Sequence, residues 1–209
     1  VVCGGGKISA ATLAVLEQIK DRNIRVALIS PDPFLLSKTQ TKHNRVVWNV
    51  IQEYARSGLI DSVYLFSNRH MESFVGQGSI GDLYTNINNG IANFIVTNDW
   101  FENNDPLVGN LFEPKLNSAI RTVSIGKIDD FQESLYFPLD NITESSYYYS
   151  ISQEKIENEK NLLTQIKQHV TLEREKKRNS SFGIWQNTTD YSYFYSIKYT
   201  HYIQSEEKV

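Results

Sequence analysis

Two short apolar runs without polar alternation constrain the fold of this 209-residue chain more than any other feature. They are residues 25–30, Arg-Val-Ala-Leu-Ile-Ser, and residues 61–66, Asp-Ser-Val-Tyr-Leu-Phe. A strand that is apolar at successive positions is covered on both faces, which is typical of parallel sheets. Each run follows a segment with helical spacing of apolar residues, at 11–19 and 46–54. The sequence therefore predicts an α/β fold with a mostly parallel sheet and flanking helices.

A triglycine turn opens the chain, in the order Val1-Val2-Cys3-Gly4-Gly5-Gly6-Lys7, and connects a β-type run to the first helix. Glycine backbone can approach an anion closely, and the first N–H groups of a helix have no intrahelical acceptors. Gly4, Gly5, Gly6 and Lys7 are therefore candidate phosphate-binding residues. The plainer interpretation is a tight corner between a strand and a helix.

Other glycine-rich motifs fit this turn less well. The dinucleotide fingerprint spaces its glycines through the turn and is followed by an acidic residue further along the chain. A P-loop has Ser or Thr directly after its Lys, whereas Ile8 follows Lys7 here. The turn also resembles the pyrophosphate turn of iron-dependent alcohol dehydrogenases, so an NAD-binding dehydrogenase fragment is kept as an alternative.

The amino-acid composition narrows the classes of protein to which this chain can belong. Hydrophobic residues make up 40% of the chain, enough to bury a substantial core. No run approaches the roughly 18 apolar residues of a membrane span, and no signal peptide opens the chain, so we expect a cytoplasmic protein without a membrane partner. One cysteine excludes an internal disulfide, and a net charge of −3 gives no reason to expect nucleic-acid binding. Val1-Val2 reads as the end of a buried strand, which predicts a segment of a longer protein.

The remainder of the chain predicts a second, smaller unit. A helical stripe runs from 80 to 95, a polar loop from 97 to 114, and a strand from 121 to 128. A long helix is predicted over 152–178, followed by an antiparallel hairpin of residues 182–185 and 191–203. We therefore expect a nucleotide-binding domain over 1–114 and an α+β domain over 115–209.

Taken in order, these elements resemble the second half of the nucleotide-binding domain of the tubulin/FtsZ superfamily. The similarity rests on the triglycine turn, on Ser30-Pro31 at a strand end and on Asn44 just before the next predicted helix. It continues with residues 61–68, which parallel an Asp-x-x-Tyr-x-x-x-Asn strand, and with Gly81-Asp82-Leu83 at the start of a central helix. The match covers residues 1 to about 110.

The resemblance implies a bound guanine nucleotide. In that family an amide at the strand end reads guanine, which makes Asn68 the candidate here, the alternative being an Asn that closes a strand-to-loop turn. Asn44 would contact the nucleoside, and either Asn86 or Tyr84 on the central helix would contact the base. Two departures concern this site. Lys7-Ile8-Ser9 replaces the usual Thr-Gly-Ser, and Thr41 stands where the family has a ribose-binding Glu.

The resemblance also implies hydrolysis between subunits of a head-to-tail homopolymer. An acidic residue after the central helix would orient water toward a Mg²⁺-bound triphosphate held by the next subunit. Asn103-Asn104-Asp105 resembles the family's Asn-x-Asp at that place, so Asp105 is the first candidate and Glu113 the second. A solvated turn acid is the alternative for both.

The leading hypothesis is therefore a GTP-binding, filament-forming protein that uses GTP and Mg²⁺ and assembles with copies of itself. The alternative from another class is a structural assembly protein with the same fold and no nucleotide. The NAD-binding dehydrogenase fragment remains as a third hypothesis.

Overall fold

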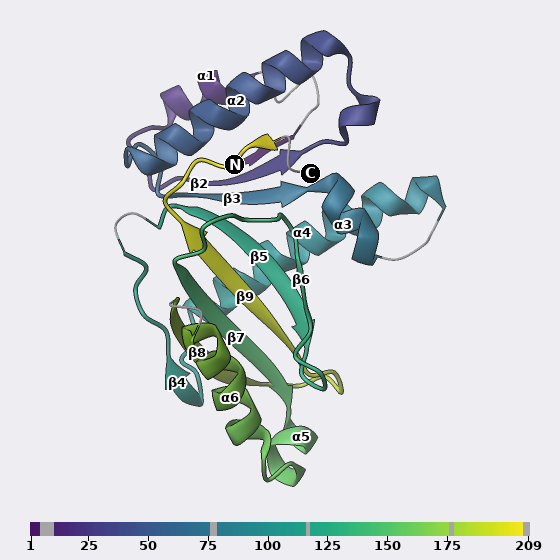
Figure 1. Ribbon diagram of the computed structural model, residues 1–209, viewed down its shortest axis with the longest axis vertical. Helices are drawn as coiled ribbons and strands as arrows, with labels where there is room; N and C mark the ends of the chain where they lie inside the picture. The colour runs from purple at the N-terminus through teal and green to yellow at the C-terminus, as the bar shows by residue number, and fades with distance from the viewer. Residues whose placement is uncertain (5–10, 76–78, 116–117, 176–177, 207–209) are drawn as a thin grey trace.

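A computed structural model describes residues 1–4, 11–75, 79–115, 118–175 and 178–206 (Figure 1). Its strands are β1 (Val2–Cys3), β2 (Arg25–Ser30), β3 (Ser62–Ser67), β4 (Val108–Asn110), β5 (Ile120–Lys127), β6 (Glu133–Leu135), β7 (Glu144–Ser152), β8 (Asn179–Asn187) and β9 (Tyr193–Thr200). Its helices are α1 (Thr12–Gln18), α2 (Lys38–Arg56), α3 (Asn68–Val75), α4 (Ile80–Glu102), α5 (Gln153–Asn158) and α6 (Leu162–Glu175), with a 3₁₀ turn, η2, at Pro33–Leu35.

All nine strands of the described residues form one mixed sheet in the order β1-β2-β3-β5-β9-β7-β8-β4, with β6 beside β5. The first four strands in this order are parallel, as the two apolar runs predicted. β5, β9 and β7 then pair antiparallel, and β7 pairs parallel with β8. One sheet thus runs through both predicted domains, and their division at residue 114 stays a prediction.

Helices cover both faces of the sheet (Figure 1). On one face α1 and α2 pack over β1, β2 and β3, and α6 packs over the β7–β9 half. On the other face α4 crosses from one half to the other, with Ile87, Ile91 and Phe94 in its buried stripe. Ser37 and Gln40 close a capping box at the start of α2, which fixes where that helix begins.

The predicted helix over 152–178 is wrong in one respect, because two helices occupy this segment. α5 ends at Asn158, and Glu159 has extended backbone with φ −92° and ψ 91°. The residues at the break, 158–161, are polar and offer no apolar position to bury. Leu162, Ile166 and Val170 then begin a separate stripe that packs on the sheet.

The predicted hairpin of 182–185 and 191–203 is also wrong. β8 and β9 do not pair with each other, because β7 lies between them and bonds to both. Every residue of β7 is buried, with Tyr147 and Tyr149 on the α6 face and Tyr148 on the α4 face. Tyrosine rings that are covered on both faces give no alternating pattern, so this strand was not predicted from the sequence.

The central helix continues beyond the predicted end at residue 95, into the predicted loop of 97–114. Phe101, in its last turn, is buried and lies 4.7 Å from Trp185 between ring centroids. Burial of this ring against the sheet stabilises about two extra turns of helix in a segment whose local sequence favours a loop.

Candidate functional site

The carboxyl ends of three parallel strands meet at one edge of the sheet, which we call the carboxyl edge. Gly4 follows β1, Ser30 ends β2, and Asn68 follows β3. Strand register aligns Cys3 with Leu28 and Ser30 with Ser67, so Gly4 and Asn68 are separated by β2 alone. Adjacent strands lie about 4.8 Å apart, which puts β1 and β3 roughly 10 Å from each other. Ligands of parallel α/β sheets bind at such an edge.

Buried side-chain atoms without a hydrogen-bond partner among the described residues lie near this edge and also on β7 and β8. Near the edge they are Ser30 Oγ, which lies beside the Glu206 carboxyl and lowers its pKa, and Nδ2 of Asn44, which lies inside α2 and not before it. Asn68, which directly follows β3, is half-buried. A buried polar atom without a partner costs about 1–3 kcal/mol, so a polar ligand or water that bonded to it would recover that energy.

The other predicted nucleotide contacts lie on the adjoining elements or outside the described residues. Tyr84, half-buried, and Asn86, exposed, are in the first turns of α4, which extend beyond the ends of the strands (Figure 1). Gly5, Gly6 and Lys7 fall outside the described residues. Among the described residues, a Cβ added to Gly4 would meet only Ile29 Cβ, at 3.9 Å.

The segment after β9 returns along α2 toward the carboxyl edge, held by Gln204. Trp48 Nε1 and Gln52 Nε2 donate to Gln204 O at 2.8 and 3.1 Å, and Gln204 N donates to Gln52 Oε1 at 2.8 Å. Asp140 N donates to Gln204 Oε1 at 2.8 Å. Two residues further on, burial raises the pKa of the Glu206 carboxyl, although neighbouring Arg45 and Ser30 lower it.

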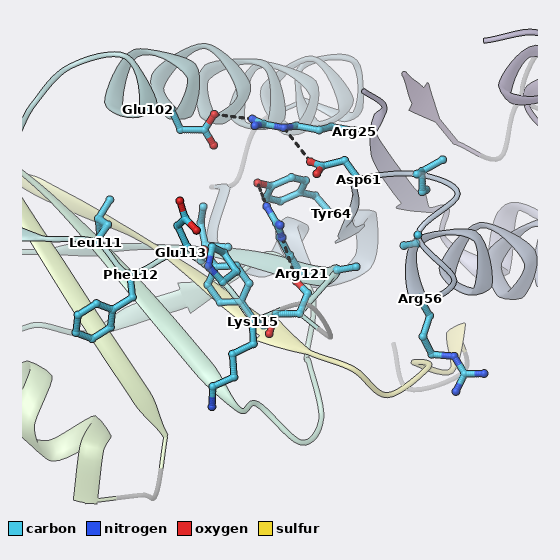
Figure 2. Close-up of a pocket in the computed structure, with 18 of the residues that line it drawn as sticks. Arg25, Arg56, Asp61, Tyr64, Glu102, Leu111, Phe112, Glu113, Lys115 and Arg121 are labelled. Atoms are coloured by element: carbon cyan, nitrogen blue, oxygen red, sulfur yellow. Dashed lines mark hydrogen bonds and ion pairs between the residues drawn. The ribbon is translucent and has the colours of Figure 1, made fainter. Parts of the chain in front are cut away.

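Opposite the carboxyl edge, where β2, β3 and β5 begin, lies a pocket of about 840 Å³ (Figure 2). Arg25 joins two of its walls, because its Nη1 donates to Glu102 at 2.6 Å and its Nε to Asp61 at 3.3 Å. Figure 2 shows Phe112 and Glu113 on the segment that faces this ion pair. We call this end of the sheet the amino edge.

Arg121 forms the floor of the pocket. Its guanidinium carbon lies 5.4 Å from the ring centroid of Tyr64 and 5.3 Å from that of Tyr199, which are cation–π distances. It also donates to Tyr64 OH at 3.0 Å and to Ser118 O at 3.2 Å. Burial raises the pKa of Tyr199 to about 12, although Arg121 lowers it, so the phenol stays neutral and the positive charge remains.

Sequence reasoning missed Arg25 and Arg121 as lining residues of a pocket. The signal available was a charged residue at the start of an otherwise apolar strand, since Arg25 opens β2 and Arg121 is the second residue of β5. That pattern is also typical of a solvated strand end, so it did not indicate a cavity.

Asp105 and Glu113, the two candidate acids, both belong to the amino-edge side of the fold. Glu113 lines the pocket and is exposed. Asp105 is exposed on the loop after α4, and the preceding residue, Asn104, accepts a 2.8 Å hydrogen bond from Trp185 Nε1 through its carbonyl. The structure therefore separates both acids from Gly4 and Asn68 by the length of the parallel strands.

The described residues contain no group of three or more His, Cys, Asp or Glu that could hold a metal ion. Within the same residues no helix is long and apolar enough to cross a membrane.

No protein-family model and no curated protein matches the sequence. Solved structures do match. A GTPγS-form protofilament of TubZ from Bacillus thuringiensis serovar israelensis has a TM-score of 0.70 at 12% identity, over 98% of this chain and 60% of that one. An FtsZ dimer from M. jannaschii has a TM-score of 0.67 at 12% identity, over 95% and 62%. CetZ1 from Haloferax volcanii, a GDP-bound monomer, has a TM-score of 0.64 at 16% identity, over 100% and 66%.

These similarities establish a tubulin/FtsZ-like fold, which confirms the fold expected from the resemblance. The chain spans roughly three-fifths to two-thirds of the length of these proteins.

Proposed function

We propose that this protein binds GTP with Mg²⁺ at the carboxyl edge, assembles head to tail with copies of itself, and hydrolyses GTP between subunits. The fold supports this proposal, because structures that share it are described as a GTPγS-form protofilament and a GDP-bound monomer. A cytoplasmic location, consistent with the single free Cys3, is part of the same proposal.

The observation that carries the proposal is the placement of the candidate residues at opposite ends of the same strands. β2 has six residues, which at about 3.3 Å each gives roughly 20 Å between the two edges. Asp105 therefore lies too far from Gly4 and Asn68 to act on a nucleotide in its own subunit. A second copy, displaced along the strands, would bring its amino edge onto the carboxyl edge of the first. Such a contact does not close on itself and propagates as a filament.

At the carboxyl edge we assign binding roles to residues of four elements. Asn68 would accept hydrogen bonds from the guanine ring N–H and 2-amino group, and Asn44 would contact the nucleoside. Tyr84 would stack on the base, or Asn86 would bond to it. Gly4 and the glycines after it, with Lys7, would hold the phosphates.

At the amino edge we assign the hydrolytic role to Asp105 first and to Glu113 second. A carboxylate beside the γ-phosphate of the neighbouring subunit accepts a hydrogen bond from water, orients it and accepts its proton as the water attacks phosphorus. Magnesium held by the phosphates would neutralise charge that builds on the leaving group. Removal of the carboxylate should slow turnover while assembly continues.

Guanine recognition by Asn68 can be tested with two nucleotides. Inosine triphosphate lacks the 2-amino group, so the wild-type protein should bind GTP more tightly by about tenfold, as one hydrogen bond to a buried group predicts. Asn68→Ala should lose most of that discrimination, whereas Asn93→Ala, an exposed amide on α4, should keep it. Equal discrimination in all three proteins would reject the assignment.

Hydrolysis and assembly are tested together by light scattering and phosphate release with GTP and Mg²⁺. We expect Asp105→Asn to lower turnover per subunit by about 10²-fold or more while filaments persist longer. Asp190→Asn, an exposed loop acid in the other half of the chain, is the matched control. Absence of GTP binding together with assembly would favour the structural protein without nucleotide.

A further inference from the structure

Two large apolar side chains are exposed at the carboxyl edge. Phe34 and Leu35, in the 3₁₀ turn η2 just after β2, are 85% and 66% exposed. Their backbone is well held, because Asp32 Oδ1 accepts a 2.9 Å hydrogen bond from Phe34 N and Pro33 fixes the first φ of the turn. An ordered turn that presents a phenyl ring to solvent is typical of a contact surface.

The amino edge offers a hollow where such side chains could be buried. The 840 Å³ pocket is lined on one side by Leu111, Phe112 and Glu113, and Phe112 is 50% exposed. The phenyl ring of Phe112 and the aliphatic atoms of Leu111 give this wall an apolar surface, while Arg25 and Arg121 bring charge to the opposite side and the floor.

Charge is also complementary between the two edges. Arg69, exposed on α3, has its guanidinium carbon 6.0 Å from the centroid of the Phe34 ring. Glu113 is exposed and has no ion-pair partner among the described residues. A cation beside the apolar turn thus matches an anion beside the apolar wall.

We propose that Phe34 and Leu35 of one copy enter the amino-edge pocket of the next copy, packing on Leu111 and Phe112. Arg69 then pairs with Glu113 of that copy. This inference rests on the head-to-tail assembly proposed above and names the residues that form the contact between copies. It assigns Glu113 to docking and leaves Asp105 as the candidate for hydrolysis.

The direction of the strands favours this head-to-tail pairing over a two-fold symmetric contact. Phe34 follows the end of β2 and the pocket surrounds the start of β2, so displacement of a second copy along the strands brings turn and pocket together. A two-fold contact would instead place Phe34 against another Phe34 and Arg69 against another Arg69, which repel each other. The apolar turn and the charged pair therefore both indicate a heterologous contact with a second copy.

An engineered disulfide tests the contact directly. Phe34→Cys and Phe112→Cys in one chain should give a ladder of oligomers on mild oxidation, because each subunit then links to two others. An equal mixture of the two single variants should stop at dimers. Cys3, the natural cysteine, is 1% exposed and should add little background.

Charge reversal tests the ion pair that we propose between Arg69 of one copy and Glu113 of the next. Arg69→Glu and Glu113→Arg should each raise the critical concentration for assembly with GTPγS by about tenfold. The double variant should return the critical concentration most of the way to the wild-type value. Phe34→Ser should raise it by about tenfold to a hundredfold. Val96→Ser, at a 70% exposed position on the outer side of α4, is the matched control and should change nothing.

Failure of this inference is distinguishable from failure of the proposed function. Assembly of the wild type with GTP, but without a ladder from the double-cysteine variant, would overturn the docking contact alone. A ladder without GTP binding would support the contact and reject the nucleotide. Absence of both assembly and ladder would overturn both.

Discussion

A buried ion pair in the second half of the sheet makes the most quantitative prediction. Lys198 Nζ, on β9, lies 2.9 Å from Glu133 Oε1 and donates to Tyr147 OH at 2.7 Å. The other carboxylate oxygen, Oε2, accepts hydrogen bonds from Ser124 and Ser196 at 2.7 and 3.0 Å. The Lys198 side chain is 1% exposed, whereas that of Glu133 is 24% exposed.

This difference in exposure predicts an asymmetry between two variants. Glu133→Gln leaves an ammonium group fully buried without its counter-ion, which should destabilise the fold by about 3–5 kcal/mol. Lys198→Met leaves a carboxylate that water still reaches and to which two serines still donate hydrogen bonds. We therefore expect this variant to lose stability only at the lower end of that range or below it. The double variant should recover most of the loss, because neither charge remains.

Urea unfolding of the four proteins at neutral pH measures these differences. For a chain of this size each kcal/mol shifts Tm by about 2–4 °C, so thermal melting should report a fall of roughly 6–20 °C for Glu133→Gln. Losses that simply add in the double variant, or a Lys198→Met variant less stable than Glu133→Gln, would refute the reasoning.

The pair also predicts a dependence on pH. Burial alone would raise the pKa of Glu133, but Lys198 and the two serine hydroxyls together hold it below its ordinary value. A carboxyl whose pKa is depressed in the folded state stabilises the fold above its unfolded pKa, near 4, and that contribution is lost as the pH falls through the folded value. Glu133→Gln should therefore flatten the acid side of the stability profile.

Three further predictions concern packing and burial. Gly126→Ala would place a Cβ 2.2 Å from Phe194 Cζ and should destabilise the fold by about 1–3 kcal/mol in urea unfolding. Gln204→Ala leaves the backbone N–H of Asp140 without its acceptor and should destabilise by about 1–3 kcal/mol, with faster amide exchange at that position. Burial raises the pKa of the Cys3 thiol, although Thr12 lowers it, so a thiol reagent should modify Cys3 far faster in urea than in the native protein.

The parallel part of the fold was predictable because its strands are buried on both faces. Residues 25–30 and 61–66 each contain four successive apolar positions, and both form strands of the parallel region, as β2 and β3. Their helices were predicted from the 3.6-residue spacing of apolar residues, and the structure adds a capping box at Ser37 for α2.

The second half was predicted less well, because tertiary contacts decide its elements. The run around Tyr148 gives no strand pattern until β8 and β9 cover its edges and α4 and α6 cover its faces. The pairing of β7 with two distant strands depends on contacts between residues far apart in the chain, which local periodicity does not report.

The sequence indicated which residues of the candidate site lie at strand ends. It did not indicate how these residues are arranged in space. Ser30 and Asn68 terminate neighbouring parallel strands, so their shared edge follows from the strand prediction alone. The roles of Asn44, Asn68, Asp105 and Glu113 stay predictions. The amino-edge pocket could not be predicted, because its walls come from strand starts and from the segment around Phe112, joined by the ion pairs of Arg25.

α4 is the element through which the two edges can influence each other. Its 23 residues span about 34 Å, from Tyr84 near the carboxyl edge to Glu102, which is ion-paired with Arg25 at the amino edge. A buried stripe from Ile87 to Phe101 holds the helix on the sheet, so we expect a shift at its first turns to reach the Arg25 pair at its last turn. Under the proposed function, nucleotide contacts at Tyr84 or Asn86 would thus bias the shape of the pocket that receives the next copy. Arg25→Gln should therefore weaken assembly more than it weakens GTP binding, whereas an equal loss of both would argue against this route.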